Sequence, residues 1–98
     1  MENLEPMTAV AFLKEAMQVQ NKRGETYDSE GGERSMAKVV TVFNTYYGTE
    51  MTESQGWHFM EILKDVRQLQ KNKYHKDSAL DKVSYAALHA ESLAKEDG

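Results

Sequence analysis

The sequence predicts an all-α protein of one domain, residues 1–98, folded as a four-helix bundle. Apolar side chains recur every three or four residues in four separate stretches, which is the pattern of amphipathic helices. Glycines and capping residues separate those stretches. A chain of 98 residues supports only one modest core. We therefore also expect the domain to enlarge its core by forming a homo-oligomer.

Composition excludes several classes of protein. The chain has no cysteine, which excludes disulfides, thiolate metal sites and cysteine nucleophiles. No apolar run approaches the ~20 residues of a membrane-spanning helix, and the N-terminus lacks the basic start of a secretory signal. The net charge of −4 weighs against nucleic acid as a partner, although the basic stretch KNKYHK at 71–76 leaves room for a local contact. We expect a cytoplasmic protein with no membrane partner.

The first predicted helix covers residues 7–22 and presents one apolar stripe to the core. Thr8 suits its N-cap, and Gly24 is placed to end it. The stripe consists of Val10, Leu13, Met17 and Val19 or Gln20, flanked by Ala9, Phe12 and Ala16. An acidic, glycine-rich loop is expected over 24–34, with the ring of Tyr27 pinning it to the body of the protein.

The second predicted helix covers residues 35–47. Its apolar face comprises Met36, Val39, Val40, Phe43 and Tyr46 or Tyr47, and Gly48 follows as a stop signal. By propensity alone, the run KVVTVF could form a strand. The three- and four-residue spacing and the lack of a second strand to pair with favour the helix.

The third predicted helix covers residues 53–71 and begins with a capping box, in which the side chains of Thr52 and Gln55 each accept from the other's backbone N–H. Five apolar side chains share one face and are expected to form its core stripe: Phe59, Ile62, Leu63, Val66 and Leu69. Another face collects polar residues: His58, Glu61, Asp65 and Gln68. The carboxylates are therefore expected to point away from the core.

The fourth predicted helix covers residues 78–95, capped by Asp77 or Ser78. Its expected core face contains Leu80, Val83, Ala87, Ala90 and Ala94, and the alanines would let a neighbouring helix approach closely. The opposite side carries Asp77, Asp81, Tyr85 and Leu88. With a short connector between them, the third and fourth helices are expected to form an antiparallel hairpin.

Charged residues on the two hairpin helices allow two interpretations. In one, Glu61, Asp77 and Asp81 approach one another and hold Mg²⁺, which in turn binds phosphates and activates water. In the other, the cations Lys64 and Arg67 form structural salt bridges to the two aspartates. The same cations could instead contact a phosphate. The residues alone leave these alternatives open.

The sequence contains no complete motif for any other kind of catalytic or metal-binding site. The three histidines stand at no zinc-ligand spacing relative to one another. The sequence contains no G-x-S-x-G nucleophile motif and no phosphate-binding loop. No catalytic residue is therefore assigned from motifs.

Five segments form a recognisable pattern: RGETYDS, YYGTEMT, LKDVR, the His-x-Asp at 75–77, and DKVSYAALHAE. The pattern resembles a family of small phage and prophage proteins of uncharacterised function. Members typically show an arginine followed by a Tyr-Gly-Asp loop, a Leu-Leu-Lys-x-x-Arg helix and an Asp-x-x-x-Asp-x-x-Gly-Tyr-Ala-Ala-Leu helix. The resemblance marks a cluster of seven residues: Arg23, Tyr27, Lys64, Arg67, Asp77, Asp81 and Tyr85. Ser29 and Ser84 depart from the glycines usual at these two places.

That family is in turn distantly similar to the all-α MazG-like nucleotide pyrophosphohydrolases. The similarity implies a MazG-like fold and helical oligomers. Those enzymes hold Mg²⁺ on Glu-x-x-Glu and Glu-x-x-Asp motifs, whereas the intervals here are Glu61-x-x-x-Asp65 and Asp77-x-x-x-Asp81. The match therefore fails at the metal-binding motifs.

Two functional hypotheses follow. The first is a non-catalytic phage accessory protein that binds a host or phage protein through an exposed helix face. The alternative is a Mg²⁺-dependent enzyme that cleaves nucleoside triphosphates, in which Glu61, Asp77 and Asp81 bind the metal. Lys64 and Arg67 would then hold the phosphates. The short chain, its acidic charge and the incomplete motifs favour the first hypothesis.

Overall fold

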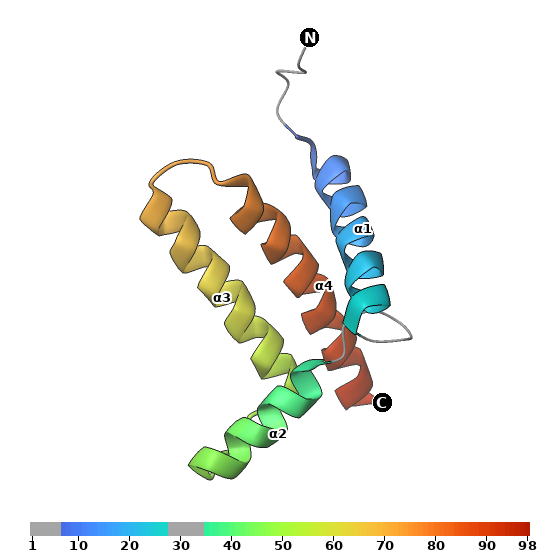
Figure 1. Ribbon diagram of the computed structural model, residues 1–98, viewed down its shortest axis with the longest axis vertical. Coiled ribbons are helices and arrows are strands. Elements are labelled where there is room, and N and C mark those ends of the chain that lie inside the picture. Colours follow the sequence, from blue (N-terminus) through green and yellow to red (C-terminus); the bar gives the residue numbers. More distant parts are fainter. Residues whose placement is uncertain (1–6, 28–34) are drawn as a thin grey trace.

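The computed structural model describes residues 7–27 and 35–98. These ranges contain four helices and no strand: α1 (Ala9–Tyr27), α2 (Ser35–Tyr47), α3 (Glu53–Lys71) and α4 (Lys76–Asp97) (Figure 1). The prediction of an all-α fold is confirmed, and the run KVVTVF is helical rather than a strand. None of the helices within these ranges is both long and apolar enough to span a membrane.

The ends of α1 and α4 differ from the prediction. Helix α1 continues through Gly24 to Tyr27, so the expected loop over 24–34 is wrong at its first four residues. One glycine inside a helix costs only ~1 kcal/mol, which an established helix tolerates. The remainder of that loop, 28–34, lies outside the described residues. Helix α4 begins at Lys76, and its N-cap is His75 rather than Asp77 or Ser78.

The connection from α2 to α3 agrees with the prediction from the sequence. Gly48 adopts a φ of 63° after the last turn of α2, a conformation that glycine reaches without strain. The side chain of Asn44 then clips the turn, because its amide donates to the Met51 carbonyl and its oxygen accepts from the Met51 N–H, both at 2.9 Å. The predicted capping box of Thr52 and Gln55 is present at the start of α3.

Helices α3 and α4 form an antiparallel hairpin, as predicted. Helix α1 packs on α4, and α2 packs on the N-terminal part of α3, so that α4 lies between α1 and α3 in Figure 1. The molecule is elongated, with extents of 52 × 31 × 25 Å. Three helices therefore lie side by side, and each leaves a large part of its surface uncovered.

The core is small and lies where α2, α3 and α4 meet. It consists of Met36, Val40, Trp57 and Leu88, with Met51, Met60 and Tyr85 packed against it. The rings of Trp57 and Tyr85 stack with centroids 5.7 Å apart. Gly56 permits the close approach of α2, because a Cβ there would lie 2.5 Å from Met36 Sδ.

The predicted core stripe of α3 is wrong for the single chain. Phe59 is 61% exposed and Leu69 is 77% exposed, and Ile62 and Val66 are also exposed. The polar face of α3 packs on α4 instead. On α4, the side expected to be outward carries the buried Ser78, Ser84 and Leu88, whereas Ala87, Ala90 and Ala94 of the expected core face are exposed. The spacing defines the faces of a helix but does not say which neighbour covers each one.

Candidate functional site

The contact between α3 and α4 includes a row of charged pairs beside the apolar core. We call this row the polar seam, made of Glu61, Lys64 and Asp65 on α3 and Asp81, Lys82 and His89 on α4. Its partners lie at roughly equal distances along the chain from the turn at Tyr74, as an antiparallel hairpin requires. The seam brings together four residues that the sequence singles out or places on one polar face: Glu61, Lys64, Asp65 and Asp81.

The most buried pair of the seam joins Lys64 Nζ to Asp81 Oδ2 at 2.9 Å. Lys64 is buried, and the side chain of Asp81 is 28% exposed. An ammonium group is stable in such a place only with a close anionic partner. This pair matches half of the predicted salt-bridge network.

The second buried contact joins His89 to Glu61. The Nδ1 atom of His89 lies 2.8 Å from Glu61 Oε1, and the contact is an ion pair when the imidazole is protonated. His58 stacks on His89 with ring centroids 5.2 Å apart. The sequence places His58 and Glu61 on one face but does not predict the contact with His89, which is 28 residues further along the chain than Glu61. The hairpin register, counted from the turn, could have paired them.

The outer pair joins Lys82 Nζ to Asp65 Oδ1 at 2.7 Å, with both side chains about half exposed. The hydrogen bond to Asp65 and the charge of its carboxylate raise the pKa of Lys82 above 10.5. The pair is open to solvent, so its contribution to stability is small.

A carboxylate from the end of α4 caps the start of α3. Glu96 accepts hydrogen bonds from the Ser54 hydroxyl at 2.7 Å and from the Ser54 backbone N–H at 3.0 Å. These two bonds hold the pKa of Glu96 below its ordinary value of 4.5. The arrangement is favourable because the first turn of a helix leaves N–H groups unpaired. No sequence motif predicts this cap, because Glu96 lies near the end of α4, 42 residues from Ser54.

The remaining predicted site residues do not join the seam. Arg67 and Asp77 are exposed, and within the described ranges neither forms an ion pair. Arg23 is half-buried on α1, one turn beyond Gln20. Tyr27 is the last residue of α1, and its side chain lies outside the described atoms. Tyr85 belongs to the core, where it stacks on Trp57.

The acidic residues do not fit a magnesium site in this arrangement. Asp81 is paired with Lys64, Glu61 is paired with His89, and Asp77 is exposed at the start of α4. Within 7–27 and 35–98, no group of three or more histidines and carboxylates is placed to hold a metal ion. Every buried side-chain nitrogen and oxygen described has a hydrogen-bond partner, so no buried polar atom of the seam is left unpaired. The Mg²⁺ interpretation of Glu61, Asp77 and Asp81 therefore gains no support.

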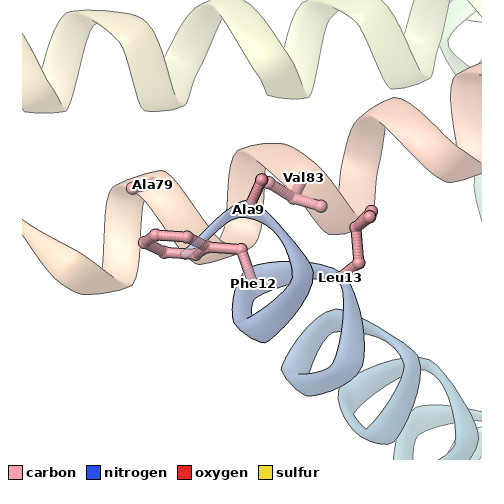
Figure 2. A pocket seen from close by; sticks show the side chains of 5 residues that line it. All are labelled: Ala9, Phe12, Leu13, Ala79 and Val83. Atoms are coloured by element: carbon pink, nitrogen blue, oxygen red, sulfur yellow. The ribbon is translucent and has the colours of Figure 1, made fainter. Parts of the chain in front are cut away.

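A second feature is an apolar groove between α1 and α4. Two hollows of about 360 and 590 Å³ share Leu13 and Val83 and so form one trough, which we call the α1–α4 groove. Figure 2 shows the apolar side chains of α1 and α4 that line its first part. The rest of its lining includes Ala16, Met17, Gln20, Ala86 and Ala87. The amide of Gln20 donates to the Ser84 carbonyl and hydroxyl and thereby holds α1 on α4.

Comparison with known families identifies one domain model. It is described as a domain of unknown function, DUF6378, and it matches residues 11–93, which include nearly all of the four helices. Neither the curated proteins nor the solved structures give a match to the chain. Because the family model covers most of its length, this chain belongs to the DUF6378 family.

Proposed function

We propose that this chain is a non-catalytic accessory protein that binds another protein through the α1–α4 groove. The resemblance to phage and prophage proteins suggests the setting, which is the cytoplasm of a bacterial host and a partner from the host or the phage. The observation that carries the proposal is the groove itself, which is long, apolar and formed by two helices. Grooves of this kind accept an amphipathic helix laid along them.

The groove has the features that helix binding needs. Three large side chains spaced one turn apart on α1 stand along it or beside it, and all are more than half exposed: Val10, Leu13 and Met17. Opposite them, Ala79, Ala86 and Ala87 keep α4 flat, so an incoming helix can approach closely. Burial of exposed apolar side chains is the main source of affinity in such complexes.

Self-association and a MazG-like arrangement are further parts of the proposal. The resemblance supports the MazG-like fold, and the small core supports a homo-oligomer. Catalysis is not proposed, because Asp81 is engaged by Lys64 and Glu61 by His89, which leaves only Asp77 of the three carboxylates that would hold a metal. A protein can share a fold with an enzyme family and lack its activity.

Capture experiments with matched variants test the proposal. The immobilised chain is exposed to a bacterial lysate, with and without phage infection, beside Leu13→Glu in the groove and Leu93→Glu on α4. We expect a specific protein to be retained by wild type and by Leu93→Glu but lost with Leu13→Glu, and calorimetry with the purified partner to repeat that order. Equal retention by all three chains, or cleavage of any of a panel of nucleoside triphosphates with Mg²⁺, would refute the proposal.

A further inference from the structure

Helix α3 uses its two faces in the opposite way from a helix in a self-sufficient monomer. Its polar face is turned inward against α4 and forms the polar seam. Its apolar face is turned outward and carries Phe59, Ile62, Val66 and Leu69, which we call the α3 stripe. A surface helix normally buries its apolar side and leaves its charges in water. The inversion indicates that something covers the α3 stripe.

We infer that the α3 stripe is the contact between two copies of this chain, related by a two-fold axis that sets their α3 helices antiparallel. The inference rests on the self-association included in the proposed function and names the face that carries it. It does not depend on the α1–α4 groove, which lies on other elements.

The exposed area of the whole chain exceeds that of a compact monomer of its mass. The whole chain exposes 7404 Å², whereas a compact monomer of 11.2 kDa exposes about 5,700 Å². The excess, about 1,700 Å² per copy, lies within the ~1,000–2,500 Å² that each partner of an obligate dimer buries. The excess belongs to all 98 residues, so its location has to come from the exposed side chains of the described helices. Helix α2 also exposes large apolar side chains, and what sets the α3 stripe apart is that it lies opposite the polar seam on the same helix.

The shape of the stripe suits a second copy. Its four members alternate in steps of three and four residues, which is the spacing of helix pairs that interlock side chains. No charge interrupts the row, so it can face an identical row without placing like charges together. A convex stripe can pair with itself about a two-fold axis. The concave α1–α4 groove cannot, because two grooves placed face to face leave a void.

An antiparallel pairing also fills a hollow at one end of the stripe. Phe59, Val39, Phe43 and Met51 line a hollow of about 210 Å³ between α2 and α3. Leu69, the most exposed member of the stripe, lies at the other end of α3. The two-fold axis brings Leu69 of one copy to the hollow of the other, and the reverse, so both hollows are filled at once. Parallel pairing would leave the hollows and the leucines at opposite ends.

Light scattering on the purified full chain tests the inference. We expect wild type to show twice the mass of one chain, and Ile62→Glu to show the mass of one chain while its circular dichroism remains helical. The matched control is Leu93→Glu, because Leu93 is 49% exposed and Ile62 is 46% exposed. The control should keep the wild-type mass. A single-chain mass for wild type, or loss of the dimer only in the control, would overturn the inference.

Cross-linking provides a second test of the α3 contact, which remains available if Ile62→Glu fails to fold. The natural chain has no cysteine, so Ile62→Cys and Leu93→Cys each introduce the only thiol. With a short bis-maleimide, we expect covalent dimers from Ile62→Cys and none from Leu93→Cys at the same concentration. Equal yields from both variants, or none from either, would contradict the α3 contact. Failure to capture a partner in the groove, with the mass still that of a dimer, would count only against the proposed function.

Discussion

Removing the carboxylate of Asp81 should reveal whether the polar seam is a structural element. Asp81→Asn leaves Lys64 with its ammonium group buried and without the anion that stands 2.9 Å away. Breaking a fully buried pair from one side costs about 3–5 kcal/mol. Because the side chain of Asp81 is 28% exposed, water can reach the vacated place, and we expect about 2–3 kcal/mol of lost stability.

Removing the cation of the pair instead of the anion should lower the free energy of unfolding by less. Lys64→Met leaves a carboxylate that water can hydrate, and we expect a loss of about 1 kcal/mol. In the double variant no buried cation remains, so its stability should return to within about 1 kcal/mol of wild type. The coupling between the two positions is then about 2–4 kcal/mol, which a double-mutant cycle resolves.

Urea unfolding measures these values. The single tryptophan, Trp57, is 2% exposed and stacked on Tyr85, so its fluorescence reports the packing of the hairpin. All four chains are compared at one fixed concentration, because the stability of a self-associating protein depends on it. A loss below about 0.5 kcal/mol for Asp81→Asn would refute the structural reading of the seam. So would a rise of the wild-type midpoint on adding Mg²⁺, since a ligand that binds only the folded state stabilises it.

Three further predictions concern the elements that support the seam. Gly56→Ala should lower the free energy of unfolding by about 1–2 kcal/mol, because its Cβ would meet Met36 and Val40 at 2.5–3.0 Å and this crowding exceeds the gain in helix propensity. Asn44→Ala should cost about 2 kcal/mol by removing the three hydrogen bonds that Asn44 makes to Thr49 and Met51, and urea unfolding at neutral pH measures both changes. The Ser54 bonds lower the pKa of Glu96, so the stability they give is present above pH 4.5 and is lost as the pH falls through the lowered pKa. Urea midpoints measured across the acid range should therefore fall more steeply for wild type than for Glu96→Gln, and parallel curves would contradict this.

The sequence predicts the local parts of the fold well. The bounds of α2 and α3 and the capping box of Thr52 agree with the structure, because each depends on residues a few positions apart. The end of α1 is mispredicted at Gly24, because adding residues to a formed helix is favourable enough to continue it through this glycine. The faces of α3 are correctly separated by their spacing. Their assignment to core and solvent fails, because it depends on which helix, or which copy, covers each face.

The candidate site is predicted in part for the same reason. The pairing of Lys64 with Asp81 follows from two helices joined by a short connector, and the structure contains it. Arg67 and Asp77 are predicted to join the same network but are exposed. Asp77 shares a side of α4 with Asp81 but lies in the first turn of the helix. The contacts of His89 with Glu61 and of Glu96 with Ser54 need the register between α3 and α4. Periodicity along one helix does not supply that register.

If the α3 stripe is buried between two copies, as we propose, it accounts for the stability of a chain with so small a core. Charged pairs specify the register of the hairpin but add little net free energy, because desolvation offsets much of their attraction. The four stripe residues are 44–77% exposed, and burying them would contribute roughly 1 kcal/mol each, or about 4 kcal/mol per copy. That amount is comparable to the whole margin of a small domain. We therefore expect the urea midpoint of wild type to rise with chain concentration and that of Ile62→Glu to stay constant. A wild-type midpoint independent of concentration would mean that the hairpin and its small core suffice alone.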